Sequence, residues 1–301
     1  MSKLIVALAV AALAALVAVA VVAAPNKPRG RPDAHSPGSF AVACSLSHVS
    51  YDDPIVMPGM SDMAHEHAFF GNVSTSASST RPSMLASATT CSDPQDTAAV
   101  WVPVAFVGDQ TYVPQREKTY YFRASDVVHT VPPDLRAIAG ANTMHADDGE
   151  PPVGLTWDCG IDTPRSDHPY DCTPYAGGEY RVDGVIARVD FPTCWDGRTD
   201  APDHRSHLVY RDRSACPAGH GRAIPRISVR VHYGVWDPCA GATPCGPDAA
   251  SAADVAMTLS SGSYRSMHAD FWNTWQQAAL DELVDRCVVG RQGCGVIASD
   301  G

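Results

Sequence analysis

The stretch "RISVRVHYGVW" (226–236) alternates apolar and polar residues along most of its length. Ile227, Val229, Val231 and Tyr233 fall on one side of an extended chain, because successive side chains of a β-strand point to opposite faces. The intervening arginines, serine and histidine fall on the other side. This period of two predicts a strand with one face in a hydrophobic core.

Short apolar runs bounded by glycine, proline and aspartate recur along the chain. They have the length of strands and comprise the segments 99–107, 118–124, 180–191 and 254–261. The 24 prolines and 23 glycines favour long loops between strands over a helical bundle. The sequence therefore predicts a mainly β domain, with a β-sandwich or jelly-roll-like fold and long loops.

One segment near the C-terminus has helical spacing instead. In "HADFWNTWQQAALDELVDRC" (268–287), Phe271, Trp275, Ala278 and Leu283 fall on one side of a helix. Asp270 is a candidate N-cap for it. We therefore predict a C-terminal helix over these residues, packed against the sheet.

The first residues, "MSKLIVALAVAALAALVAVAVVAAP" (1–25), combine Lys3 with a long apolar run. This pattern is typical of an export signal, which we assign to residues 1–24. The run is also long enough to cross a bilayer, so an uncleaved N-terminal anchor is the alternative, and a membrane is a partner only in that case. The predicted segments that follow are a Pro/Gly-rich tether (25–39), a single folded domain (40–290) and a tail (291–301).

The chain contains ten cysteines and no CxxC pair. An even number of dispersed cysteines in an exported protein indicates up to five disulfides rather than a zinc ribbon or a redox motif. Connectivity stays open at this point, and short local loops are candidates: Cys159–Cys172, Cys239–Cys245 and Cys287–Cys294. We expect an extracellular protein, either secreted or associated with the cell wall.

The formal net charge of −11 argues against nucleic acid or an anionic membrane surface as the main partner. The sequence also contains no GxSxG elbow, Walker loop or GxGxxG fingerprint. Histidine and aspartate clusters are therefore the main chemical signal.

These residues gather in three segments: "MAHEHAFFGN" (63–72), "FPTCWDGRTDAPDHRSHLVY" (191–210) and "YRSMHADFW" (264–272). In the first, an extended chain places His65 and His67 on one face. We predict that the three segments meet in one cleft, with these catalytic candidates: His65, His67, Asp196, Asp203, His204, His207, His268 and Asp270. The alternative is that each histidine only holds a loop by hydrogen bonding to a backbone carbonyl.

In this order, the motifs resemble a secreted domain-of-unknown-function family, the one numbered nineteen-ninety-six. The resemblance extends over residues 44–287 and includes the "FPTCWDG" and "DHRSH" runs. The family occurs in fungi and actinobacteria, sometimes beside WSC or carbohydrate-binding modules, which implies work on polysaccharide by association only. The family pattern is usually apolar at the position of Glu66, so the resemblance implies that Glu66 is not a shared catalytic carboxylate.

The clusters support two functional hypotheses. In the first, the protein is a carbohydrate-active hydrolase or lyase that acts on cell-wall or environmental polysaccharide through paired carboxylates or a histidine base. Its candidate substrate-binding residues are Trp195, Arg205 and Trp272. In the second, a non-enzymatic extracellular module binds a glycan or a divalent metal ion, with these candidate ligands: His65, His67 and His207.

Overall fold

A computed structural model describes residues 37–126, 128–141, 152–177, 182–212, 215–248 and 255–297. The predicted export signal and residues 25–36 of the predicted tether lie outside these ranges. Ser39 begins a strand, although the predicted tether extends to this residue. None of the helices in the described ranges has the length and apolar character needed to cross a bilayer.

Ten strands form one sheet, in which all neighbours are antiparallel except β1 and β17 (Gly293–Val296). The order of the other nine strands is β7 (Arg136–Gly140), β16 (His268–Trp272), β3 (Ala99–Pro103), β2 (His67–Gly71), β1 (Ser39–Ser50), β6 (Arg116–Phe122), β13 (Arg226–His232), β9 (Val182–Asp190) and β8 (Leu155–Gly160). β7 also contacts β9, so the sheet nearly closes on itself.

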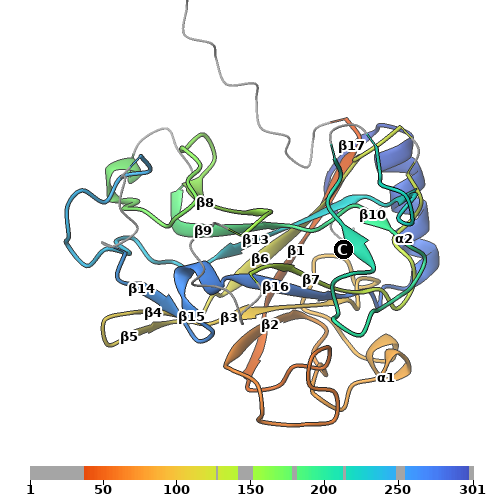
Figure 1. Ribbon diagram of the computed structural model, residues 1–301, viewed down its shortest axis with the longest axis horizontal. Coiled ribbons are helices and arrows are strands. Elements are labelled where there is room, and N and C mark those ends of the chain that lie inside the picture. The colour runs from red at the N-terminus through yellow and green to blue at the C-terminus, as the bar shows by residue number, and fades with distance from the viewer. Residues whose placement is uncertain are drawn as a thin grey trace, which may run out of the picture. The chain divides into compact units, whose positions relative to one another are not determined.

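β1 belongs to two halves of this sheet (Figure 1). Its residues 39–45 pair with β6, whereas residues 46–50 pair with β2. The register shifts between Leu46 and His48, as happens where a strand bends from one layer of a sandwich into the other. One half of the sheet therefore folds over the other half.

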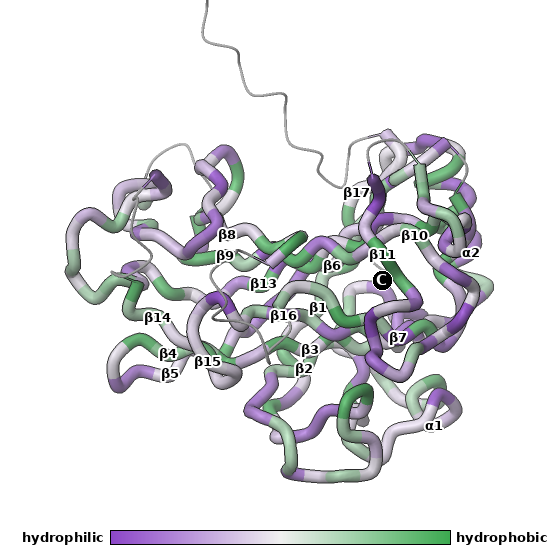
Figure 2. Tube along the Cα trace, viewed as in Figure 1, coloured by the Kyte–Doolittle hydropathy of each residue, from purple (hydrophilic) through white to green (hydrophobic). Residues whose placement is uncertain are grey.

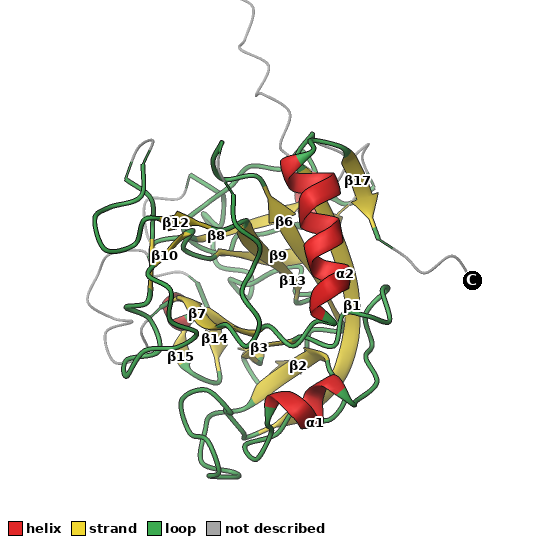
Figure 3. Cartoon of the chain, turned by 90° about the vertical axis from the view of Figure 1, so that its right-hand side faces the viewer, coloured by secondary structure: helices red, strands yellow, loops and turns green. Residues whose placement is uncertain are grey.

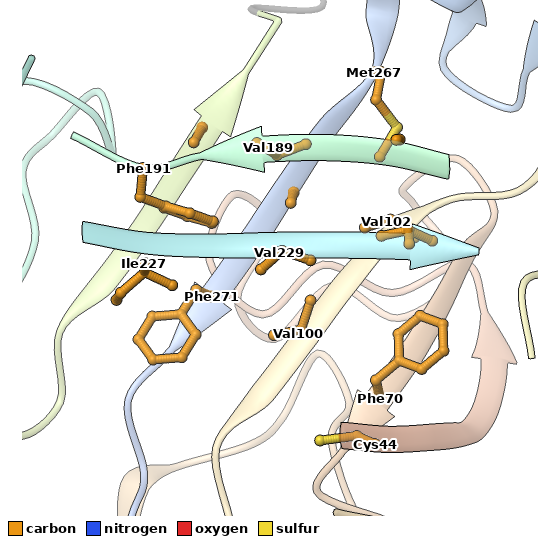
Figure 4. Packing of buried hydrophobic residues seen from close by; sticks show 14 of the residues in the cluster. Cys44, Phe70, Val100, Val102, Val189, Phe191, Ile227, Val229, Met267 and Phe271 are labelled. Atoms are coloured by element: carbon orange, nitrogen blue, oxygen red, sulfur yellow. The ribbon is translucent and has the colours of Figure 1, made fainter. Parts of the chain in front are cut away.

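The main hydrophobic core lies between these two halves. Val189 of β9 and Val229 of β13 face Val100 of β3 and Phe271 of β16, and the two pairs of strands cross (Figure 4). All four side chains are buried. Hydrophobic positions alternate with hydrophilic ones along much of the sheet (Figure 2), as expected for strands with one face in a core. The predicted mainly β fold with sandwich layers is confirmed.

The alternation in the opening stretch is also confirmed. β13 buries Ile227, Val229 and Val231 in the main core. Arg230 and His232 alternate with them and point to the outward face of the sheet.

Smaller elements complete the described part of the chain. One small sheet contains β11 (Leu208–Val209), β10 (Cys194–Trp195) and β12 (Arg222–Ala223), and another contains β15 (Gly262–Ser263), β14 (Met257–Leu259), β4 (Ala105–Val107) and β5 (Gln110–Tyr112). The helices are α1 (Arg81–Leu85), α2 (Gln277–Leu283), its π-helical continuation η5 (Val284–Val289) and the 3-10 turns η2 (Thr173–Tyr175) and η4 (Tyr264–Ser266). Figure 3 shows α2 and its continuation beside β1.

The predicted helix over 268–287 is wrong in its first half. Residues 268–272 form β16, and the helix begins only at Gln277. β16 is paired on both sides, with β3 and with β7, so its backbone hydrogen bonds go to the sheet. Asp270 is consequently not an N-cap but the middle residue of a strand. The C-terminal half of the prediction is confirmed, because α2 and η5 bury Leu280 and Val284 in the core.

All ten cysteines are paired, in the disulfides Cys44–Cys91, Cys159–Cys172, Cys194–Cys216, Cys239–Cys245 and Cys287–Cys294. The three predicted local loops are among them. The last disulfide and the pairing of β17 with β1 give structure to part of the segment that we predicted as a tail. Residues 298–301 lie outside the described ranges.

Gly140, at the end of β7, is expected to tolerate no side chain. Its φ is +85°, and a Cβ there would lie 2.5 Å from the carbonyl oxygen of Met267. We expect Gly140→Ala to lower the free energy of unfolding by about 2–3 kcal/mol, measured by denaturant titration. Gly108→Ala is the control: φ is +54° there but no atom lies within 4 Å of the added carbon. It should cost only about 1 kcal/mol, and equal losses in the two variants would contradict the close approach.

Candidate metal centre

Two histidines enter the site from strands on either side of β3. His67 begins β2 and stands opposite Pro103. His268 begins β16, in which Asp270 stands opposite Trp101 of β3. Because His268 precedes Asp270 by two residues, it falls in the same row as Pro103 and His67, on the face away from the main core. The Nε2 atoms of the two imidazoles lie 3.4 Å apart.

His65 brings a third imidazole to this point. Its ring centroid lies 4.2 Å from that of His67, and its Nε2 lies 3.3 Å from the Nε2 of His268. The three residues offer ligand atoms that all lie within 4.8 Å of one another. We call His65, His67 and His268 the histidine triad. The predicted sharing of one face by His65 and His67 is confirmed by the contact between their rings.

Backbone carbonyls determine which nitrogen carries the proton in two of the rings. The Nδ1–H of His67 donates to the carbonyl of Asp52 at 3.1 Å, and the Nδ1–H of His268 donates to the carbonyl of Ser266 at 2.9 Å. A carbonyl only accepts, so in each neutral ring the proton is on Nδ1 and the Nε2 carries a lone pair. Two lone pairs therefore face each other across 3.4 Å, which is the arrangement that a shared cation requires.

Burial keeps the triad neutral. It lowers the pKa of His65 to about 4 and that of His268 to about 3, and it holds the pKa of His67 well below the usual value. The neighbouring imidazoles lower the pKa values of His67 and His268 further. Neutral imidazole is the form that binds metal ions.

The distances also fit an ion. A Zn–N bond is about 2.0–2.1 Å long, so two nitrogens of a tetrahedral site are about 3.3–3.4 Å apart. The Nε2 of His268 lies 3.3 Å from that of His65 and 3.4 Å from that of His67, in agreement with this value. Imidazole donors suit zinc, copper, iron and nickel better than calcium or magnesium.

A buried carboxylate stands beside the triad. Asp270 is 1% exposed, and neither of its carboxylate oxygens has a hydrogen-bond partner within the described part of the chain. One of these oxygens lies 3.7 Å from the Nε2 of His268. Asp53 is a second acid near the triad. It forms a group with His67 and Asp270, in which one ligand atom from each residue lies within 4.8 Å of the other two. Burial raises the pKa of Asp270 well above its usual range, and nearby Asp53 raises it further. An unpartnered buried carboxylate of this kind requires a cation or a proton.

Arg205 is the member of the "DHRSH" run that approaches this group. Its guanidinium donates to the carbonyls of Gly140 and Ala141, at the end of β7 next to His268. Its charge lowers the pKa of Asp270, against the larger effect of burial. The loop before β11 is thereby fastened at the edge of the site.

The other two histidines of that run do not join the triad. The Nε2 of His207 donates to the carbonyl of Arg136 at 2.6 Å. Arg136 and His268 lie at opposite ends of the β7–β16 ladder, which are about 13 Å apart at ~3.3 Å per residue. His204 instead contacts Asp200, with its Nδ1 3.0 Å from a carboxylate oxygen. His207 thus lies outside the ligand group that it was predicted to share with His65 and His67.

The remaining acidic candidates have local partners. Asp196 forms an ion pair with Arg198 at 2.6 Å. Asp203 accepts hydrogen bonds from the backbone N–H groups of Arg205 and Ser206, and the bond from Ser206 contributes most to lowering the pKa of Asp203 to about 2. These contacts hold the loop together and match the alternative in which polar side chains fasten loops.

The two tryptophan candidates are also occupied. Trp272 is 1% exposed, its indole N–H donates to Asp134, and Arg136 lies over its ring at 4.3 Å. It therefore offers no surface for stacking on a sugar. Trp195 is half-buried under Arg222, 5.3 Å from its ring centroid.

Asp53 is the residue that sequence reasoning missed. It follows Asp52 in "YDDP" (51–54), outside the three histidine-containing segments and twelve residues before His65. Its carboxylate accepts hydrogen bonds from the N–H groups of Ile55 and Val56, and the carbonyl of Asp52 orients His67. The pair of adjacent aspartates at the start of the family-like segment was the available signal.

The family model of Domain of unknown function (DUF1996) matches residues 53–275, which includes all of the triad and both buried acids. The chain belongs to this family. No curated protein and no solved structure matched the chain. The match begins at Asp53, so the DUF1996 region starts at the first residue of the site.

Asp270→Asn tests whether the buried carboxylate of this DUF1996 protein supports an ion. At a Zn²⁺ concentration of 100 Kd, binding adds about 2.7 kcal/mol to the stability of the wild type. Loss of a group that touches the metal ligands typically lowers the affinity for the metal 10–100-fold. The stabilisation of Asp270→Asn by the same concentration of Zn²⁺ should therefore fall to about 0.4–1.4 kcal/mol. The measurement is thermal unfolding with and without Zn²⁺. The control is Asp203→Asn in the exposed loop, and a gain in Asp270→Asn equal to that of the control would contradict this role.

Proposed function

We propose that the protein is an extracellular metalloprotein that binds a divalent transition-metal ion at the histidine triad and acts there on polysaccharide. The observation that carries the metal site is the convergence of the Nε2 atoms, with two lone pairs fixed toward each other by backbone carbonyls. Five disulfides support the extracellular location, because they are stable in oxidising compartments. Polysaccharide is proposed from the family's association with wall-binding modules.

The triad has the ligand number of a catalytic site. Three protein nitrogens leave a further position on the ion for Asp270 or for an exchangeable ligand. His65 is only partly buried, unlike His67 and His268, so its side is where a substrate would approach the ion under this proposal. When bound, such an ion polarises an oxygen of the substrate or lowers the pKa of a water molecule. Asp270 and Asp53 then offer carboxylates that hold or move a proton, while Arg205 maintains the edge of the site.

Burial favours a second candidate, a structural metal site. His67 and His268 are 0% and 4% exposed, as in closed sites whose ion only adds stability. Such an ion would fasten β2, β16 and the loop before β2. Under this second candidate the ion stabilises the fold but exchanges no ligand and supports no reaction.

Replacement of triad residues tests the metal site. We expect tag-free wild type to retain one Zn²⁺ per chain after dialysis, and His67→Gln and His268→Gln to retain less than about a tenth of that, since loss of a direct ligand removes most of the affinity. His220→Gln is the matched control, because His220 donates to the carbonyl of Ser206 in a loop outside the triad. Elemental analysis gives the result. Unchanged content in both triad variants, or no metal in wild type, overturns the proposal.

A polysaccharide panel separates the two candidates. For the catalytic site, the wild type should release reducing ends or unsaturated products from at least one cell-wall polysaccharide, chelation should stop release and Zn²⁺ should restore it. Substitution of Zn²⁺ by Co²⁺ adds a spectroscopic readout, since an added ligand changes the cobalt spectrum only if a position on the ion is open. Release that continues unchanged after complete chelation contradicts metal-dependent action. A stabilising ion without any release identifies the structural site.

A further inference from the structure

The outward face of β6, β13 and β9 carries three cations in one row. Lys118 stands opposite Arg230, and Arg230 stands opposite Arg188. Directly opposed residues of an antiparallel pair have Cβ atoms about 5 Å apart, where like charges destabilise a sheet. A protein with a net charge of −11 has thus placed three positive charges side by side on a single face.

A cavity of about 420 Å³ lies over this row, and its lining includes Arg116 and His232 from the neighbouring row. A smaller cavity of about 110 Å³ shares Arg188 and Arg230 with it and extends to Arg226. Together they form what we call the cationic groove. Its charged lining comprises six cations (Arg116, Lys118, Arg165, Arg188, Arg226 and Arg230) and three acids (Glu117, Asp183 and Asp190).

Aromatic rings hold two of the arginines in place. The guanidinium of Arg230 lies 3.6 Å from the ring centroid of Tyr120, and that of Arg226 lies 4.8 Å from that of Phe122. Tyr120 and Phe122 are buried beneath them and stack on each other. A guanidinium that rests on a ring is held in a fixed orientation, and its planar shape matches that of a carboxylate.

Ion pairs fix two further cations of the groove. Arg188 pairs with buried Asp158, and Arg116 pairs with Asp183 at 2.6 Å. These contacts orient the side chains without cancelling the excess of positive charge in the lining.

The cations of the groove repel one another. Burial and then the charges of Arg230 and Arg116 lower the pKa of Lys118. Burial, followed by the charge of Arg188, lowers the pKa of Arg230 to about 10. Both side chains are therefore less stable as cations in the groove than in water, and a bound anion relieves that cost.

We propose that the cationic groove binds a segment of anionic polysaccharide that runs along β13, with its charged groups on the cations of the groove and its sugar rings against the apolar wall. Residues 226–232 of β13 run the length of the groove, which is about 20 Å at ~3.3 Å per residue. An extended chain with repeated charges fits this length better than a single ion. Ile161 and Ile186 supply apolar contacts for sugar C–H groups. Binding of an anion does not depend on the histidine triad, whereas the choice of a glycan rests on the proposed function.

Uronate carboxylates and sulfate esters share the chemistry that guanidinium groups recognise, so both are tested. The probes are hexasaccharides of galacturonate, a sulfated hexasaccharide, cellohexaose as the neutral glycan, hexaglutamate and a single-stranded DNA hexamer. Affinity is measured by calorimetry at physiological ionic strength, once with chelator and once with Zn²⁺. We expect the two acidic glycans to bind in both conditions, more weakly as salt is raised. The acidic glycan that binds more tightly shows whether the groove prefers a carboxylate or a sulfate ester.

Arg116→Gln/Lys118→Gln is the test variant, because it leaves the stacked arginines intact. We expect about a 100-fold loss of affinity, roughly tenfold for each charged contact. Arg286→Gln/Arg291→Gln removes the same charge from exposed positions outside the groove and should bind as wild type. Thermal unfolding checks that both variants are folded.

Several results overturn the proposal. They are equal binding of cellohexaose, equal or tighter binding of hexaglutamate or DNA, an unchanged affinity in the groove variant, or no binding of any acidic glycan by the wild type. Loss of metal binding in triad variants leaves the groove result intact, so failure of the metal site and failure of the groove are distinguishable.

Discussion

The structure depends on one strand, β1, being shared by two halves of a single sheet. Because residues 39–45 pair with β6 and residues 46–50 with β2, the halves fold against each other and enclose one core. Each central strand then has an inward face, which is mainly apolar, and an outward face, which is free to carry polar groups. The histidine triad lies on the outward face of one half, and the cationic groove lies on that of the other.

The outward face around the triad is itself covered. A second hydrophobic cluster, which includes Phe69, Trp101 and Ile138 from three strands, is completed by Ile55 from the loop before β2 and Met84 from α1. Water is therefore displaced from the surroundings of the triad, which favours neutral imidazoles. The same low polarity strengthens the attraction between an ion and a buried carboxylate. A covered sheet face therefore produces both effects more strongly than an exposed loop would.

Period-two patterning and cysteine spacing predicted much of the fold, since both are local properties of the chain. The first property predicts the strand within residues 226–236, and the second predicts three short disulfide loops. The helical spacing of Phe271 and Trp275 predicts a helix over β16, and only the pairing of this segment with the sequence-distant β3 and β7 makes it a strand. The same limit applies to the site: residue type alone groups His207 with His65, whereas Asp53 lies outside the three histidine-containing segments.

The charges of the outward faces do not follow from stability alone. Opposed cations cost free energy in a sheet, and aromatic stacking of Arg230 together with the Arg188–Asp158 pair offsets some of that cost. On the other half, Asp270 remains buried without a hydrogen-bond partner among the described residues, which also costs free energy. Folds tolerate such costs where the residues serve binding or chemistry. Both faces therefore have the energetic character expected of the two proposed sites, one for a cation and one for an anion.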